Sequence, residues 1–117
     1  MQCLLLPLID EAGWRELPKA EQDQRIAAYP AYVQALKQAG ALVGNYRPQP
    51  SFAAKTVRTA NGETRVSDGP HAATKEQLGG VYIIDVPDLD AALSWAARNP
   101  AADYGVVEVR PIWEPPR

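Results

Sequence analysis

The chain has 117 residues, a formal net charge of −2, 46% hydrophobic residues and 22% charged residues. These values are typical of one soluble globular domain that is large enough to bury a hydrophobic core. Because the net charge is negative and no stretch interleaves aromatic with basic residues, we expect no nucleic-acid partner and no attraction to an anionic membrane.

The cysteine content and the N-terminal sequence favour a cytoplasmic location. Cys3 is the only cysteine, so no disulfide can form within the chain, as is typical of a reducing compartment. The opening run MQCLLLPLI is too short to span a bilayer and lacks the basic start of a signal peptide. We therefore expect a cytoplasmic protein without a membrane segment.

The first part of the chain predicts a strand, a helix and a second strand. Residues 3–9 form a nearly continuous apolar run, as in a strand that is covered on both faces. Residues 18–40 have helical periodicity, and Pro30 within them predicts a kink or break because proline removes a helical hydrogen bond. A short strand is expected over residues 41–46. The expected buried stripe of the helix consists of Ile26, Tyr29, Val33 and Leu36.

The middle of the chain predicts a hairpin followed by a buried strand. Asn61-Gly62 lies between residues 54–59 and 63–67, and this residue pair tolerates the positive φ angles of a tight turn. The hairpin is mostly polar, so we expect it to project from the main sheet. Residues 81–86, VYIIDV, are the most strand-like run of the sequence.

The C-terminal part predicts a second helix and a last strand. Asp88 is expected to cap the helix at its N-terminus, and Asn99-Pro100 to end it. The last strand is expected over residues 105–112, and residues 114–117 are expected to form a tail after a single domain over residues 1–113. The buried stripe of this helix is expected to contain Leu89, Ala92, Leu93 and Ala96.

The order of elements, β-α-β, hairpin, β-α-β, indicates a ferredoxin-like α+β sandwich with two helices on one face of an antiparallel sheet. The strand residues Leu4, Leu5, Leu6 and Leu8 are apolar on both faces, as are residues 81–84, so a homodimer is the simplest way to cover the second face. Glu108 and Arg110 alternate with two valines in the last strand. If the valines face the helices, this carboxylate and guanidinium should pair or line a cleft between two sheets.

The stretch Ser67–Gly80, SDGPHAATKEQLGG, contains the only histidine and a Gly-Pro turn. It resembles the signature of the YCII-related family, DGPF type, in which Asp-Gly-Pro-Phe precedes a Lys-Glu-x-Leu-Gly-Gly stretch. The resemblance implies a dimeric α/β barrel. Relatives of the DGPF type are encoded with, or fused to, extracytoplasmic-function sigma factors, which implies a possible link to transcriptional control.

His71 and Asp68 are the candidate catalytic residues. A histidine can act as a general acid or base near neutral pH, and Asp68 could orient its ring across the Gly-Pro turn. Alternatively, His71 replaces the phenylalanine of the family signature as a packing ring. Asp68 could likewise be a turn residue that bonds to the backbone.

Four further residues are candidates for substrate binding. Lys75 could contact an anion or a carbonyl group and Glu76 could act as a base, or the two could be a solvated pair. Arg110 could line a cleft between subunits. In the wider superfamily a histidine of the first helix has been proposed to work with an aspartate. The matching residue here is Tyr32, which could bond to a ligand or belong to the core.

These residues favour a small cofactor-independent enzyme of the lyase or isomerase type, acting on a small molecule in a dimer cleft around the DGPH turn. A single histidine and a distant cysteine do not provide a zinc site, and no phosphate-binding loop is present. The alternative is a non-catalytic ligand-binding or regulatory module linked to sigma-factor-dependent transcription. We expect no metal and no cofactor.

Overall fold

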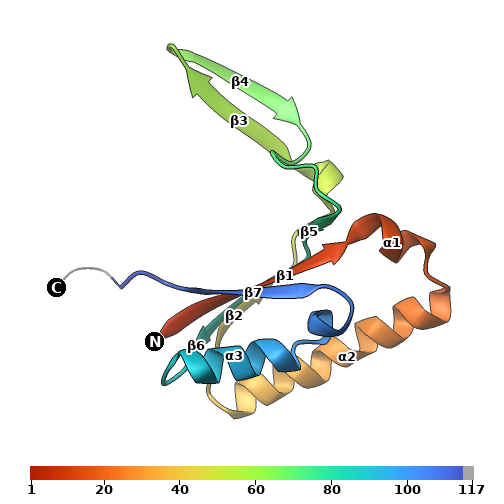
Figure 1. The fold of residues 1–117 in the computed structure, drawn as a ribbon, viewed down its shortest axis with the longest axis vertical. Coiled ribbons are helices and arrows are strands. Elements are labelled where there is room, and N and C mark those ends of the chain that lie inside the picture. Colours follow the sequence, from red (N-terminus) through yellow and green to blue (C-terminus); the bar gives the residue numbers. More distant parts are fainter. Residues whose placement is uncertain (115–117) are drawn as a thin grey trace.

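The structure is a computed structural model that describes residues 1–114 (Figure 1). The described residues contain three α-helices, seven strands and two short 3₁₀ turns. The helices are α1 (Glu11–Glu16), α2 (Lys19–Gln38) and α3 (Leu89–Arg98). The strands are β1 (Gln2–Asp10), β2 (Leu42–Tyr46), β3 (Lys55–Ala60), β4 (Glu63–Asp68), β5 (Glu76–Leu78), β6 (Val81–Asp85) and β7 (Val106–Pro111). The 3₁₀ turns are Ser51–Ala53 and Pro100–Asp103.

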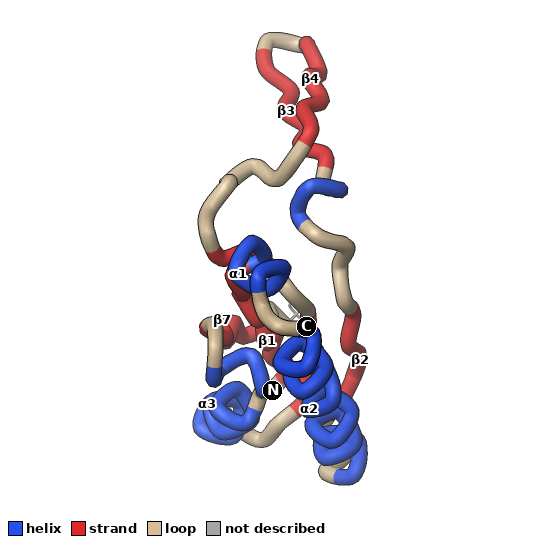
Figure 2. Tube along the Cα trace, turned by 90° about the vertical axis from the view of Figure 1, so that its right-hand side faces the viewer, coloured by secondary structure: helices blue, strands red, loops and turns tan. Residues whose placement is uncertain are grey.

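The main sheet has the ferredoxin-like order β2-β6-β1-β7, with every neighbouring pair antiparallel. The predicted fold class is therefore confirmed. The helices α2 and α3 cover one face of this sheet, and α1 is an additional short helix that follows β1 directly (Figures 1 and 2). Its N-cap is Asp10, whose carboxylate accepts a hydrogen bond of 3.0 Å from the Gly13 amide.

The hydrophobic core lies between the sheet and the two long helices. Alternate residues of β1 and β6 point into it, and Leu5 and Ile84 are fully buried there. The next residues along each strand, Leu6 and Ile83, lie on the opposite face and are only partly buried. Within residues 1–114, the sheet therefore has an apolar face that no helix covers.

The hairpin β3–β4 is a separate two-stranded sheet that projects from the body as an arm (Figures 1 and 2). Its turn has positive φ angles, 52° at Asn61 and 79° at Gly62, so the predicted turn is confirmed. The radius of gyration is 16.4 Å, whereas a compact chain of this length would have about 13 Å. The arm accounts for this elongation.

Two predictions about the helices are corrected. The helix α2 runs through Pro30 without a break, because only one carbonyl loses its partner and the remaining hydrogen bonds of a 20-residue helix persist. On α3, Leu89 and Leu93 are exposed, and the small side chains of Ala92 and Ala96 make the closest contact with the sheet. The predicted cap is confirmed, since Asp88 accepts a hydrogen bond of 2.9 Å from the Ala91 amide.

Gly79 and Gly80 form an irregularity between β5 and β6, which run along the same edge of β1. From Leu5, opposite Tyr82, to Leu8, opposite Leu78, β1 advances three residues and its partner advances four. The extra residue is a β-bulge, which turns Leu78 to the same face as Leu8. The Gly-Gly pair thus sets which face each side chain of β5 occupies.

Gly105 allows the close approach of β7 to β1. A Cβ atom at this position would lie 2.3 Å from the carbonyl oxygen of Leu8, which cannot move without shifting the central strand. We expect Gly105→Ala to lower the free energy of unfolding by about 1–3 kcal/mol in urea titrations. Gly80→Ala is the control, because its Cβ would meet neighbours only at 3.7 Å; an equal loss in both variants would contradict this explanation.

Within residues 1–114, no helix is both long enough and apolar enough to cross a membrane. Of the predicted tail over residues 114–117, residues 115–117 lie outside the described part of the chain.

Candidate functional site

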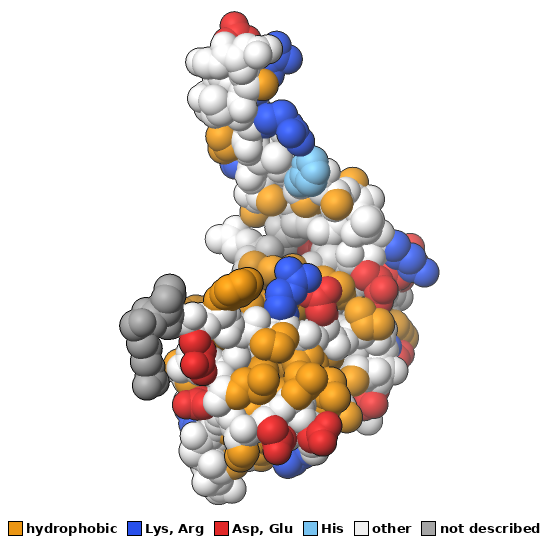
Figure 3. All heavy atoms as spheres, turned by 60° about the vertical axis from the view of Figure 1, so that its left-hand side comes forward, with side chains coloured by type: hydrophobic (Ala, Val, Ile, Leu, Met, Phe, Trp, Pro, Cys, Tyr) orange, Lys and Arg blue, Asp and Glu red, His pale blue; other side chains and the backbone are white. Residues whose placement is uncertain are grey.

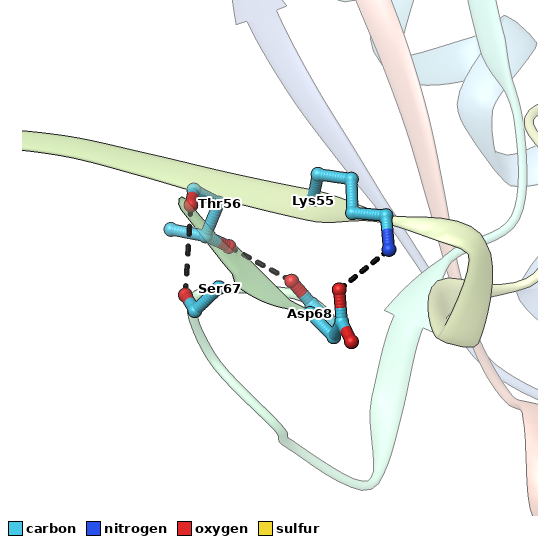
Figure 4. A network of polar contacts seen from close by, with 5 residues as sticks. Lys55, Thr56, Ser67 and Asp68 are labelled. Atoms are coloured by element: carbon cyan, nitrogen blue, oxygen red, sulfur yellow. Dashed lines mark hydrogen bonds and ion pairs between the residues drawn. The ribbon is translucent and has the colours of Figure 1, made fainter. Parts of the chain in front are cut away.

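Asp68 lies at the base of the arm, opposite Lys55 (Figure 4). The Lys55 Nζ atom is 2.5 Å from Asp68 Oδ1, and the Asp68 side chain is 86% exposed. The turn that follows is held by backbone contacts: Gly69, at φ 91°, donates a hydrogen bond of 2.8 Å to the Ala54 carbonyl, and its own carbonyl accepts one of 2.8 Å from Thr56. In the single chain, Asp68 therefore closes the base of the arm together with Lys55.

His71 follows this turn and is exposed. Its side chain forms no hydrogen bond or ion pair with any other residue between 1 and 114. The single chain therefore contains neither the predicted Asp68–His71 contact nor the packing environment of a phenylalanine. Both interpretations of His71 stay predictions.

Lys75 and Glu76 are also exposed, at the start of β5. The Lys75 Nζ atom lies 3.9 Å from Asp10 Oδ2, a long contact for a side chain that is 83% exposed. Glu76 belongs to strand β5, where it lies opposite Asp10. Within residues 1–114, no hydrogen bond or ion pair joins these two side chains to His71 or Asp68.

Glu108 and Arg110 are placed as expected. Val107 and Val109 of β7 pack toward the core, and the two charged residues lie on the uncovered face, opposite Leu6 and Leu4. The Arg110 guanidinium is 2.7 Å from the Glu108 carboxylate. This pair therefore lies within the apolar face of the sheet.

Tyr32 is part of the core. It is 6% exposed, and its hydroxyl donates a hydrogen bond of 2.8 Å to the Trp95 carbonyl. Its ring meets the ring of Tyr82 edge to face, with 5.6 Å between centroids. Burial raises the pKa of Tyr32 to about 12, so it stays protonated at neutral pH.

A cavity of about 600 Å³ lies between α2 and the sheet. Its walls come from α1, one face of α2, the end of β2, the Gly-Gly bulge and the loop before β7. The residues of α2 that line it recur at helical spacing: Ile26, Tyr29, Pro30, Val33, Gln34 and Lys37. Three members of the predicted buried stripe thus line a cavity, and of these three Val33 also packs against the core. The cavity is of the size that proteins use for small-molecule ligands.

Two tyrosines meet in the wall of this cavity. The hydroxyls of Tyr29 and Tyr104 form a short hydrogen bond, and the Arg25 guanidinium lies 4.1 Å from the centre of the Tyr104 ring. Burial, followed by the contact with Tyr104, raises the pKa of Tyr29 far above its ordinary value. Tyr29 is therefore a hydrogen-bond donor and not a base at neutral pH.

Three ionised side chains line the cavity, namely Glu11, Lys37 and Arg47. Glu11 already accepts hydrogen bonds from Ser51, one of 2.8 Å from the amide and a shorter one from the hydroxyl. Lys37 and Arg47 form no ion pair within residues 1–114. The cavity therefore carries a net positive charge and favours an anionic ligand.

None of the six residues singled out from the sequence lines this cavity. Its polar residues were passed over because Tyr29 reads as a core residue of α2 and Lys37 as a surface lysine. One signal was available: Lys37 continues the Tyr29–Val33 spacing by one more helical step, which places a cation on an apolar stripe. Among residues 1–114, no group of three His, Cys, Asp or Glu side chains could hold a metal ion.

Comparisons with known proteins bear out the resemblance in the sequence. The model of the YCII-related domain matches residues 4–115. An uncharacterized protein of Rhizobium meliloti (strain 1021) is 44% identical over 95 residues, which cover 79% of this chain and 77% of that protein. A solved structure of 5-chloro-2-hydroxyhydroquinone dehydrochlorinase (TftG) from Burkholderia phenoliruptrix AC1100, in complex with 2,5-dihydroxybenzoquinone, has a TM-score of 0.51. That match covers 97% of this chain and 94% of the other at 15% identity, which shows a shared fold.

Proposed function

We propose that this chain, which belongs to the YCII-related family, is a small cofactor-independent enzyme of the lyase or isomerase type. Its substrate is a small hydroxylated or anionic ring compound that binds in the cavity beneath α2. The observation that carries this proposal is the cavity itself, which combines apolar walls, the Tyr29–Tyr104 hydroxyls and the cations Lys37 and Arg47. The structural neighbour, whose name includes a chlorinated hydroxyhydroquinone, supports a hydroxylated ring as the first compound to test.

The proposed enzyme is a homodimer that forms through the uncovered face of the sheet. Leu4, Leu6 and Ile83 supply apolar surface there, and the Glu108–Arg110 pair lies beside them. A second sheet would remove this surface from water, which contributes about 25 cal/mol for each Å² buried. Its only cysteine, Cys3, is a free thiol, which supports the cytoplasm as the place of action.

In this dimer the DGPH turn acts at the cavity of the partner subunit. The turn and the arm project away from the body of their own chain, so Asp68, His71 and Lys75 remain in solvent unless a second chain meets them (Figure 1). There His71 transfers a proton to or from the substrate with no change of oxidation state, and Lys75 stabilises negative charge.

Proton exchange tests this function. In D₂O, we expect the protein to accelerate the exchange of ring hydrogens of 2,5-dihydroxybenzoate or of 5-chloro-2-hydroxyhydroquinone, followed by proton NMR. His71→Phe should reduce the accelerated rate by about a hundredfold, the usual contribution of a general acid or base, and remove its pH dependence near neutrality. An unchanged rate and pH profile in His71→Phe would overturn the role of this residue.

Mixed dimers test whether the turn acts across the interface. Chains with His71→Phe and chains with Arg47→Glu are expected to be inactive alone. Unfolded together and refolded, they should recover about a quarter of the wild-type rate, because half of the dimers then have one intact cavity that faces one intact turn. No recovery would mean that His71 and Arg47 of the same chain act together, and that the turn does not act across the interface.

A second candidate function is a non-catalytic ligand-binding or regulatory module, linked to sigma-factor-dependent transcription as the resemblance implies. The exposure of Asp68, His71 and Lys75 in the single chain favours it. Binding of the two ring compounds without accelerated exchange would select this function. If neither compound binds, both functions are overturned.

A further inference from the structure

The two hydroxyls of the Tyr29–Tyr104 pair leave one proton unused. Each phenol has one O–H to donate, and the hydrogen bond between them consumes one of the two protons. Both residues line the cavity, and neither hydroxyl has another hydrogen-bond partner within residues 1–114. One O–H is therefore available to an acceptor atom of a ligand. Burial also raises the pKa of Tyr29, so Tyr29 keeps its proton at neutral pH.

A cation lies on the same helix face as this donor. Tyr29 and Lys37 are eight residues apart on α2 and both line the cavity, so their backbones are separated by about 12 Å along the helix axis. Both side chains line a cavity of about 600 Å³, which is large enough for a single ring with substituents at opposite ends. Trp14 and Val33 contribute apolar surface for such a ring.

We propose that the ligand of this cavity is a flat ring acid with a carbonyl oxygen opposite its carboxylate. The carboxylate binds Lys37, with Arg47 adding positive charge, and the carbonyl oxygen accepts the free proton of the Tyr29–Tyr104 pair. This inference rests on the proposed function, because it concerns the same cavity, and it narrows the substrate to a class with two different ends.

Three probes separate the contributions of the two ends. 4-Acetylbenzoate has a carboxylate and a carbonyl, benzoate has the carboxylate alone, and acetophenone has the carbonyl alone. By isothermal titration calorimetry, we expect 4-acetylbenzoate to bind at least threefold tighter than benzoate and at least tenfold tighter than acetophenone, given the usual size of neutral and charged hydrogen bonds.

Substitutions in the protein remove the binding partner of one end of the ligand at a time. The double variant Tyr29→Phe/Tyr104→Phe should weaken the binding of 4-acetylbenzoate by about three- to tenfold. The affinity for benzoate should stay unchanged, because only the carbonyl loses its donor. Lys37→Gln should weaken the binding of both carboxylate probes by about tenfold or more and leave the affinity for acetophenone unchanged. Tyr32→Phe is the matched control, since Tyr32 is a tyrosine of the same helix that does not line the cavity, and it should leave the binding of all three probes unchanged.

Two outcomes would overturn this inference. One is equal binding of 4-acetylbenzoate to the double variant and the wild type, with circular dichroism showing that both are folded. The other is the absence of binding by all three probes. In the second case, the exchange experiment with hydroxylated rings still decides the proposed function, so the two failures are distinguishable.

Discussion

Ile83→Glu is expected to convert the proposed homodimer into monomers without unfolding the chain. Ile83 lies on the uncovered face of β6, opposite Leu4 of β1 and Gly44 of β2, so no basic side chain lies directly across from it. A carboxylate buried between two apolar sheets without a partner costs several kcal/mol, whereas the same carboxylate on a monomer stays hydrated. The variant should elute with the mass of one chain and keep the far-UV circular dichroism of the wild type.

Ser94→Glu provides the control for the added charge. Ser94 is exposed on α3, four residues before Arg98, and lies away from the uncovered face. This variant should keep the mass of two chains in light scattering. A wild-type protein that is monomeric at tens of micromolar would contradict the homodimer, and a dimeric Ile83→Glu variant would place the interface elsewhere.

The arm gives a separate reason to examine the assembly. A two-stranded hairpin is at best marginally stable by itself, yet β3 and β4 have no layer behind them in the single chain. Val57 and Val66 face each other across the arm and are both exposed. Apolar side chains gather mainly on the body, while the arm carries polar and basic groups (Figure 3). Arm and uncovered face thus both lack a second layer in the isolated chain.

The fold could be predicted because its signals are local or periodic. The tight turn at Asn61-Gly62, the cap at Asp88 and the alternation in β7 each depend on a few neighbouring residues, and all are present as expected. The helix α2 was the exception, since the bonds of its many other residues outweigh the one that Pro30 removes.

The candidate site could not be predicted in the same way. The cavity brings together Tyr29 and Lys37 of α2, Arg47 after β2 and Tyr104 before β7, and each has an ordinary local interpretation. Only the register of the sheet and the packing of α2 make them neighbours. The motif SDGPH identifies the family, but the single chain leaves its side chains in solvent.

Leu5→Ala should cause the largest loss of stability of any single substitution proposed for this chain. Leu5 is fully buried in the central strand, where it lies opposite Tyr82 on one side and Val109 on the other. Removal of its side chain leaves a cavity between the sheet and the helices that rigid neighbours fill only in part. We expect the free energy of unfolding to fall by about 2–5 kcal/mol, measured by urea titration.

Leu6→Ala is the matched control, because Leu6 is the next residue of the same strand and points to the uncovered face. Both substitutions should be measured in the Ile83→Glu variant, in which that face is expected to be solvated, so that dimer formation does not contribute to the stability. In that variant, Leu6→Ala should lower the free energy of unfolding by less than about 1 kcal/mol, since surface substitutions seldom lower it by more. Equal losses at the two positions would mean that both faces of β1 are buried within one chain, and the uncovered apolar face on which the proposed dimer depends would not exist.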